Sequence, residues 1–300
     1  MQKQKNKRIF PYYSLLFFVL YLLGGVSSFA VEISVASPSI PNTKIVFQCR
    51  VPQPYAKERI SHVLILFGGR NTDGKADTSG RMGWGKWCDD NNVFILAPGF
   101  KDNDYWEPGK WSGQALLDAL AELKKNYNVD TEHLLYYGYS AGSQASNLFA
   151  AWRSDLCIAW VSHACGYFHK PTEAMRNIPG LVTCGDADAA RYVISRRFVR
   201  DYRSMGVEIL WKTLPNHSHE VPMTSLELAR AFLEYHLKRH RQRGRVAKTK
   251  EETVSYPFVG NDLTGDYYPA NSPKVQAIKE EERVKLPDRK IAEAWRKAAE

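Results

Sequence analysis

The stretch HLLYYGYSAGSQASNLFAAW, residues 133–152, decides the fold. Residues 133–137 are mostly apolar and predict a β-strand, and residues 143–152 predict a helix. Between them lies the turn Gly138-Tyr139-Ser140-Ala141-Gly142. A serine on a sharp strand-to-helix turn has strained backbone geometry, so small residues two positions before and after it let the strand and helix approach closely. The pattern predicts a nucleophile elbow around Ser140. Without its flanks, the pentapeptide would favour a plain Gly-rich turn.

Short β-rich runs alternate with longer amphipathic runs along most of the chain. The predicted strands are residues 43–51, 62–67, 93–97, 133–137, 156–163, 180–184 and 207–213. The predicted helices are residues 82–91, 111–127, 143–152, 189–205 and 225–241. This alternation predicts an α/β fold, with a mostly parallel central sheet flanked by helices. The run 62–67 (HVLILF) is almost wholly apolar, as expected of a strand covered on both faces.

The two ends of the chain differ in character from its middle. Residues 1–30 combine a basic start, an apolar run over 12–23 and small residues at Ser28 and Ala30, which predicts a signal peptide cleaved after Ala30. An uncleaved anchor is the alternative, but the apolar run is shorter than the roughly 20 residues that span a membrane. We expect export to the periplasm or beyond the cell, a main domain over 31–242, and a C-terminal extension over 243–300. The extension is too short for a core of its own, so it packs on the domain or is partly ordered.

The charge pattern and the cysteine content give no sign of a nucleic-acid-binding protein, of a metal site or of a disulfide framework. The whole chain has a formal net charge of +9, and removing four basic residues with the signal peptide lowers this to +5. The basic residues near 238–250 lack interleaved aromatic side chains, so nucleic acid is not an expected partner. Five cysteines are an odd number without metal-like spacing, and no disulfide pairing is predicted.

A nucleophilic serine needs a base and an acid later in the chain. A serine hydroxyl is almost un-ionised at neutral pH, so a positioned base must take its proton during attack. The polar loop after the last predicted strand holds two candidates, His217 and His219, and their spacing separates them poorly. A carboxylate must orient the histidine, and Asp186 and Asp188 follow the strand 180–184. Asp188 is preferred and Asp186 is the second choice, because one of the two is expected to cap the next helix.

Attack on a carbonyl group creates an oxyanion, which two backbone N–H groups must stabilise. The amide of Ala141 follows the serine directly. The loop after strand 62–67 carries Gly68, Gly69 and Arg70, and its glycines let the backbone approach a substrate. We assign the second donor to Gly69.

The order Ser140, Asp188, His219, together with the Gly-rich loop upstream, resembles the α/β-hydrolase superfamily over residues 43–241. Within this superfamily, the sequence resembles in particular the small single-domain esterases of the carboxylesterase and dienelactone-hydrolase kind. In such esterases a His-Glu-Val step often precedes the closing helix, which favours His219 over His217 as the base. Phe67 is a departure, since many relatives carry histidine before the glycine pair.

The resemblance implies a secreted serine hydrolase that cleaves small or carbohydrate-linked carboxylic esters through an acyl-enzyme. The short interval 164–177 implies no large lid. No cofactor and no metal are expected. The expected substrate-binding residues are Arg70, Trp106, Tyr139, Tyr167 and His217. Trp106 and its neighbour Trp111 could equally anchor their loop in the core. A peptidase or thioesterase would use the same triad, and a non-catalytic binding module on this scaffold is the alternative from another class.

Overall fold

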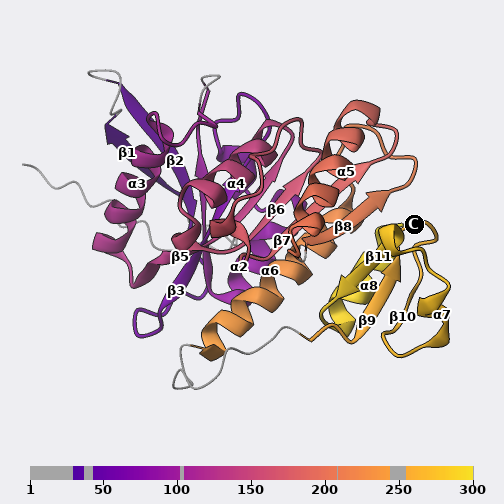
Figure 1. Ribbon diagram of the computed structural model, residues 1–300. Helices are drawn as coiled ribbons and strands as arrows, with labels where there is room; N and C mark the ends of the chain where they lie inside the picture. The colour runs from indigo at the N-terminus through magenta and orange to yellow at the C-terminus, as the bar shows by residue number, and fades with distance from the viewer. Residues whose placement is uncertain (1–29, 37–42, 102–104, 208, 244–254, 300) are drawn as a thin grey trace, which may run out of the picture.

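The computed structural model describes residues 30–36, 43–101, 105–207, 209–243 and 255–299. The strands of the main sheet are β1 (Ala30–Ala36), β2 (Lys44–Arg50), β3 (Ser61–Phe67), β4 (Val93–Pro98), β5 (Val129–Tyr139), β6 (Cys157–His163), β7 (Gly180–Gly185) and β8 (Ile209–Leu214). Their order in space is β1-β2-β4-β3-β5-β6-β7-β8 (Figure 1). The pairs β1–β2 and β2–β4 are antiparallel, and the remaining pairs are parallel. The predicted α/β class with a mostly parallel sheet is therefore confirmed.

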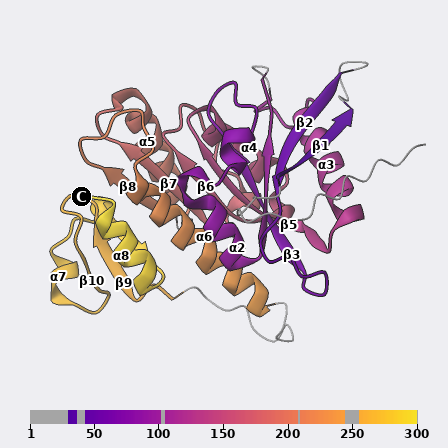
Figure 2. The same cartoon turned by 180° about the vertical axis from the view of Figure 1, so that it is seen from behind.

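The helices cover both faces of this sheet. They are α1 (Lys75–Thr78), α2 (Trp84–Asn91), α3 (Ser112–Asn126), α4 (Ala141–Trp152), α5 (Ala189–Ser204) and α6 (Met223–Arg243). Val63, Ile65 and Phe67 share a buried cluster with α3, α4 and α5. Leu64 and Leu66 point the other way and pack with α2 and α6, which lie on the face seen in Figure 2. Because alternate residues of β3 enter the two layers, residues 63–67 must all be apolar.

Element boundaries differ from the predictions in a few places. Helix α2 begins at Trp84 instead of residue 82, because Met82 and Gly83 have φ of 64° and 72° and form a separate 3₁₀ turn. Strand β5 begins at Val129, four residues before the predicted start at 133. Strand β1 was not predicted; it pairs along β2 from Ala30 opposite Arg50 to Ala36 opposite Lys44. The predicted signal peptide falls on residues 1–29, outside the described residues, and on Ala30. Within the described ranges, no helix combines the length and apolarity that crossing a membrane requires.

The C-terminal segment, residues 255–299, forms a small layer of its own. Strands β9 (Phe258–Asn261), β10 (Tyr267–Pro269) and β11 (Arg283–Leu286) make an antiparallel sheet in the order β10-β9-β11, with helices α7 (Pro273–Gln276) and α8 (Arg289–Lys297). Trp295 of α8 is fully buried, and its Nε1 donates a hydrogen bond to the Trp211 carbonyl at 2.7 Å. Helix α8 also packs beside α6, which joins the segment to the main domain.

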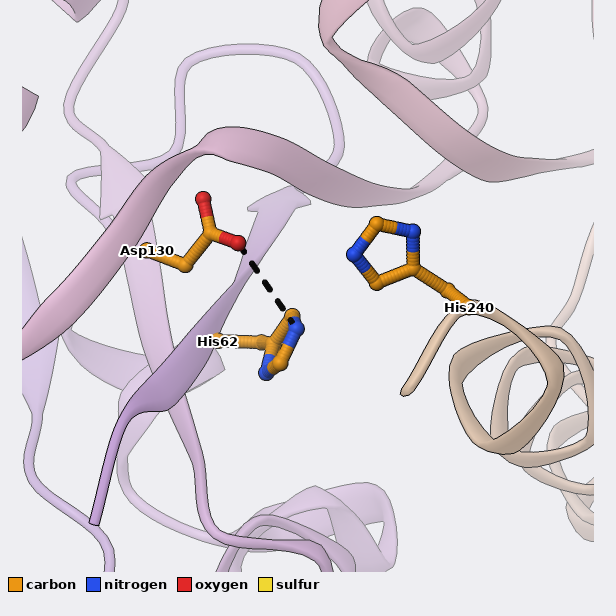
Figure 3. Close-up of side chains that lie close together, drawn as sticks. All are labelled: His62, Asp130 and His240. Carbon is orange, nitrogen blue, oxygen red and sulfur yellow. Dashed lines mark ion pairs between the residues drawn. The ribbon is translucent and has the colours of Figure 1, made fainter. Parts of the chain in front are cut away.

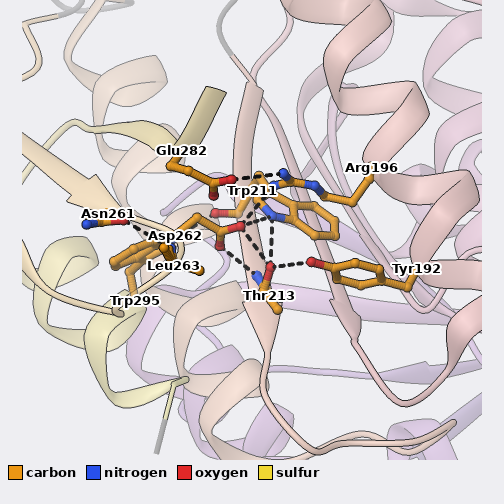
Figure 4. Close-up of polar contacts among 9 residues, drawn as sticks. All are labelled: Tyr192, Arg196, Trp211, Thr213, Asn261, Asp262, Leu263, Glu282 and Trp295. Atoms are coloured by element: carbon orange, nitrogen blue, oxygen red, sulfur yellow. Dashed lines mark hydrogen bonds and ion pairs between the residues drawn. The ribbon is translucent and has the colours of Figure 1, made fainter. Parts of the chain in front are cut away.

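Asp262 fastens this segment to the free edge of β8 (Figure 4). Its carboxylate accepts hydrogen bonds from the Thr213 amide at 3.1 Å, the Thr213 hydroxyl at 2.8 Å and Trp211 Nε1 at 2.8 Å. Arg196 from α5 forms an ion pair with the same group at 2.9 Å. An edge strand leaves unpaired amide groups that can pair with other chains. The Asp262 carboxylate accepts a hydrogen bond from one of these amides, that of Thr213, which is then not available to pair with another chain.

Candidate active site

Ser140 lies at the turn between β5 and α4, in backbone geometry that few residues adopt. Its φ of 55° and ψ of −124° are outside the usual regions for a residue with a side chain. A Cβ at Gly138 would overlap the Gly142 carbonyl, and a Cβ at Gly142 would overlap the carbonyls of Phe67 and Gly68. Both positions therefore require glycine, because any side chain there would overlap the neighbouring backbone. Gly142 also brings the elbow against the loop that follows β3.

A chain of hydrogen bonds joins the serine to a buried acid. His219 Nε2 lies 2.8 Å from Ser140 Oγ, and His219 Nδ1 lies 2.8 Å from Asp188 Oδ2. Since a carboxylate only accepts, Nδ1 carries the proton and Nε2 is free to accept from the serine. Asp188 is the residue before α5, but its side chain makes no capping hydrogen bond. Its second oxygen accepts from Arg191 at 3.1 Å, which fixes the carboxylate toward the imidazole.

The second-choice residues make other contacts. The Asp186 carboxylate accepts a hydrogen bond from the backbone amide of Asn216 at 2.7 Å and so holds the turn after β8. The His217 ring pairs with Glu220 at 2.8 Å, and its hydrogen bond lowers the pKa of that carboxyl group. The structure thus brings Asp188 and His219, rather than Asp186 and His217, to Ser140.

His163, which the sequence did not single out, supports the loop that carries His219. It is the last residue of β6 and is buried, and burial lowers its pKa to about 4. The neutral ring lies 2.6 Å from the Glu220 carbonyl through Nε2 and 2.7 Å from the Thr183 hydroxyl through Nδ1. The carbonyl can only accept, so Nε2 donates and Nδ1 accepts from Thr183. A polar residue ending an apolar strand was the available sequence signal.

The predicted oxyanion donors lie on the two sides of the elbow. Ala141 is the first residue of α4, where backbone amides are unpaired and the helix dipole favours negative charge. Gly69 follows β3, and a Cβ there would lie 2.8 Å from the Tyr139 hydroxyl. Tyr139 therefore packs directly against the Gly69 backbone. The aromatic ring of Phe67 is buried; it stacks on Tyr136 and is tilted against Phe149, with ring centroids 4.9 Å apart.

The other expected substrate contacts do not form one pocket with Ser140. Trp106 and Tyr167 share a groove of about 510 Å³ with residues that include Leu148 and Trp152. Neither Ser140 nor His219 lines this groove. Leu148 is seven residues along α4 from its first residue, which corresponds to about 10 Å of helix. The groove therefore lies along the flank of α4, away from the nucleophile.

Arg70 and Trp111 complete the set of loop residues considered in the sequence. Arg70 lies close enough to Tyr105 for its positive charge to act on that residue. Burial raises the pKa of Tyr105 to about 12, and the charge of Arg70 opposes this rise. Trp111 is buried and packs edge-on against Phe100, so it anchors its loop in the core.

Comparisons with known proteins identify the fold. No protein-family model matches the chain, and no curated protein sequence matches it. Among solved structures, a ferulic acid esterase superposes with a TM-score of 0.58 at 17% identity, over 70% of this chain and 98% of that one. The poly(3-hydroxybutyrate) depolymerase LpqC from Bordetella parapertussis gives 0.56 at 15% identity, over 68% and 88%. A thermostable esterase gives 0.53 at 18% identity over 62% of this chain, which spans only 55% of that protein's length.

The sheet order, the elbow and these superpositions define the α/β-hydrolase fold. The fold named from the sequence resemblance is therefore confirmed, and two of the three solved structures described above are named esterases.

Proposed function

We propose that the protein is a serine hydrolase that cleaves carboxylic esters, with Ser140 as nucleophile, His219 as base and Asp188 as orienting acid. The observation that carries the proposal is the unbroken pair of 2.8 Å hydrogen bonds from Asp188 through His219 to Ser140. The serine is half-buried and the histidine side chain is 39% exposed, so a substrate can reach both.

The reaction follows from these contacts. Ser140 Oγ attacks the ester carbonyl carbon while His219 Nε2 takes its proton, and Asp188 stabilises the resulting imidazolium. The amides of Ala141 and Gly69 stabilise the oxyanion. His219 then protonates the departing alcohol, which leaves an acyl group on Ser140. A water molecule, activated by the same imidazole, releases the acid and restores the serine.

The favoured substrates are small or carbohydrate-linked esters, with acetyl or feruloyl as the acyl group. The connection between β6 and β7 carries only one short 3₁₀ turn, Glu173–Met175, which favours an open site without a large lid from this connection. A protein with a similar fold is named a ferulic acid esterase. Arg70, Tyr139 and His217 would contact the ester, and the groove of Trp106 and Tyr167 would hold a distal sugar or aromatic group. Export through the predicted signal peptide would bring the enzyme to such substrates outside the cytoplasm.

Hydrolysis assays on the mature chain test this proposal. We expect turnover of p-nitrophenyl acetate and methyl ferulate, with little turnover of an aminoacyl-anilide, and loss of ester turnover in Ser140→Ala. His219→Ala should lower kcat by at least roughly 10³-fold, because it removes the imidazole that is hydrogen-bonded to the serine hydroxyl. His217→Ala should alter KM while retaining kcat. A folded wild-type protein without ester turnover would overturn the proposal, and turnover of the anilide alone would assign a peptidase.

A further inference from the structure

Three side chains from distant parts of the sequence meet at the start of the parallel strands. His62 is the second residue of β3, Asp130 is the second of β5, and His240 lies near the end of α6. One potential ligand atom from each lies within 4.8 Å of the other two. His62 Nε2 is 3.9 Å from Asp130 Oδ2, and Figure 3 shows a ring nitrogen of His240 turned toward both. Two imidazole nitrogens and one carboxylate oxygen are a common ligand set for zinc.

The carboxylate of Asp130 is already oriented toward this point. Its Oδ1 accepts hydrogen bonds from the backbone amides of Glu132, at 2.9 Å, and His133, at 3.1 Å. Its Oδ2 lies 2.9 Å from His133 Nδ1, and the His133 ring lies 4.4 Å from that of His240, measured between centroids. Metal-binding carboxylates are typically held by such outer hydrogen bonds, which set their direction and their basicity. His133 is therefore suited to hold Asp130 in place rather than to bind an ion itself.

We propose that His62, Asp130 and His240 bind one divalent transition-metal ion, with Zn²⁺ as the expected occupant and water as its fourth ligand. When three atoms lie within 4.8 Å of one another, some point lies within about 2.8 Å of all three. Each ligand atom must then move by no more than about 0.7 Å to reach the usual zinc distance of about 2.1 Å. Small side-chain rotations supply such a movement.

Arg241 opposes the ion and provides a sharp test of the geometry. Its Nη2 lies 3.3 Å from His62 Nδ1 and also donates to the Asn91 carbonyl at 2.9 Å. When Nε2 of a neutral histidine binds a metal, Nδ1 must carry the proton. Arg241 must then give up its contact with Nδ1, and its positive charge further disfavours a cation. Shortening Arg241 should consequently strengthen metal binding.

The ion would act on stability rather than on ester chemistry. His133 precedes Ser140 by seven residues of β5, a separation on the order of 20 Å along an extended strand. The cluster joins the C-terminal end of α6 to β3 and β5, and so fastens the helix that follows the loop of His219. Because the ion would bind the folded state and not the unfolded state, it should raise the melting temperature of the protein.

Zinc titration of the untagged, EDTA-treated and dialysed full chain tests the proposal. Calorimetry should show one Zn²⁺ per chain, and Co²⁺ should give the visible absorption of a low-coordinate site. We expect His240→Ala to weaken Zn²⁺ binding by at least roughly 100-fold, since it removes a ligand, and His133→Ala to weaken it by roughly 10–100-fold. Arg241→Ala should bind more tightly than the wild type. His169→Ala, outside the cluster, is the matched control and should bind as the wild type does.

The absence of saturable binding by the wild type would overturn the proposal. Binding that His240→Ala leaves intact would do the same, because the ion would then lie elsewhere. Should His240→Ala not fold, Arg241→Ala decides the matter: tighter binding supports the site, and unchanged binding contradicts it.

Discussion

Replacing Asp262 by alanine should loosen the C-terminal segment from the sheet. The Asp262 side chain is only 3% exposed and accepts three hydrogen bonds from β8 in addition to its ion pair with Arg196. The substitution leaves the Thr213 amide buried without its acceptor. Trp211 Nε1 keeps a weaker contact with the Thr213 hydroxyl at 3.2 Å, and Arg196 keeps Glu282 at 3.5 Å.

These remaining contacts set the size of the effect. Breaking a buried ion pair by removing one partner costs roughly 3–5 kcal/mol, and the 30% exposure of the Arg196 side chain and the surviving contacts favour the lower end, about 3 kcal/mol. At roughly 2–4 °C per kcal/mol for a domain of this size, the transition that includes residues 255–299 should fall by about 6–12 °C.

Differential scanning calorimetry, together with limited proteolysis of the segment, measures this change. Asp266→Ala is the matched control, since Asp266 is exposed on the same segment and its carboxylate accepts a long hydrogen bond, 3.4 Å, from the Tyr268 hydroxyl. It should shift the transition by less than about 2 °C. A Tm for Asp262→Ala within 2 °C of the wild type, with unchanged proteolysis, would refute the role assigned to this carboxylate.

Three further predictions concern the site and its support. Asp188→Asn should lower kcat roughly 10⁴-fold, because an amide can favour the wrong imidazole tautomer. Asp186→Asn should lower it less than roughly 10-fold, and steady-state kinetics compares the two. Gly142→Ala should lower kcat/KM by at least roughly 100-fold, because its Cβ displaces the elbow from the loop after β3. A soluble variant of normal activity would contradict that contact. Burial lowers the pKa of His163 to about 4 and of His236 to about 3, so the unfolded chain binds more protons below pH 6.5. Urea unfolding should show full stability above pH 6.5 and a loss on the order of 3 kcal/mol from His163 alone as pH falls to 4; unchanged stability would contradict its burial in neutral form.

The sheet and the elbow were predictable because their physical requirements appear in short stretches of sequence. A stretch of strand covered on both faces must be apolar, and residues 63–67 of β3 are. A serine turn packed against two carbonyls needs glycine, and Gly142 provides it. Such requirements are local, so one sequence suffices to read them.

Features that depend on distant contacts could not be read in this way. Strand β1 is an edge strand that exposes most of its residues, and its pairing with β2 is what defines it. The residues His62, Asp130 and His240 have no metal-like spacing, and only the packing of α6 against the sheet brings them together. Likewise, the preference for His219 rested on a resemblance, whereas its bond to Asp188 requires β7 and β8 to be neighbours.

The most direct test of the central claim is labelling of the mature protein with a fluorophosphonate, followed by mass spectrometry. This reagent reacts with a serine only when a base activates it. The proposal predicts one adduct, located on Ser140, that is absent in Ser140→Ala and formed at least roughly 10³-fold more slowly in His219→Ala, with His217→Ala still labelled. The absence of an adduct on the folded wild type, or an adduct that depends on His217 instead of His219, would contradict it.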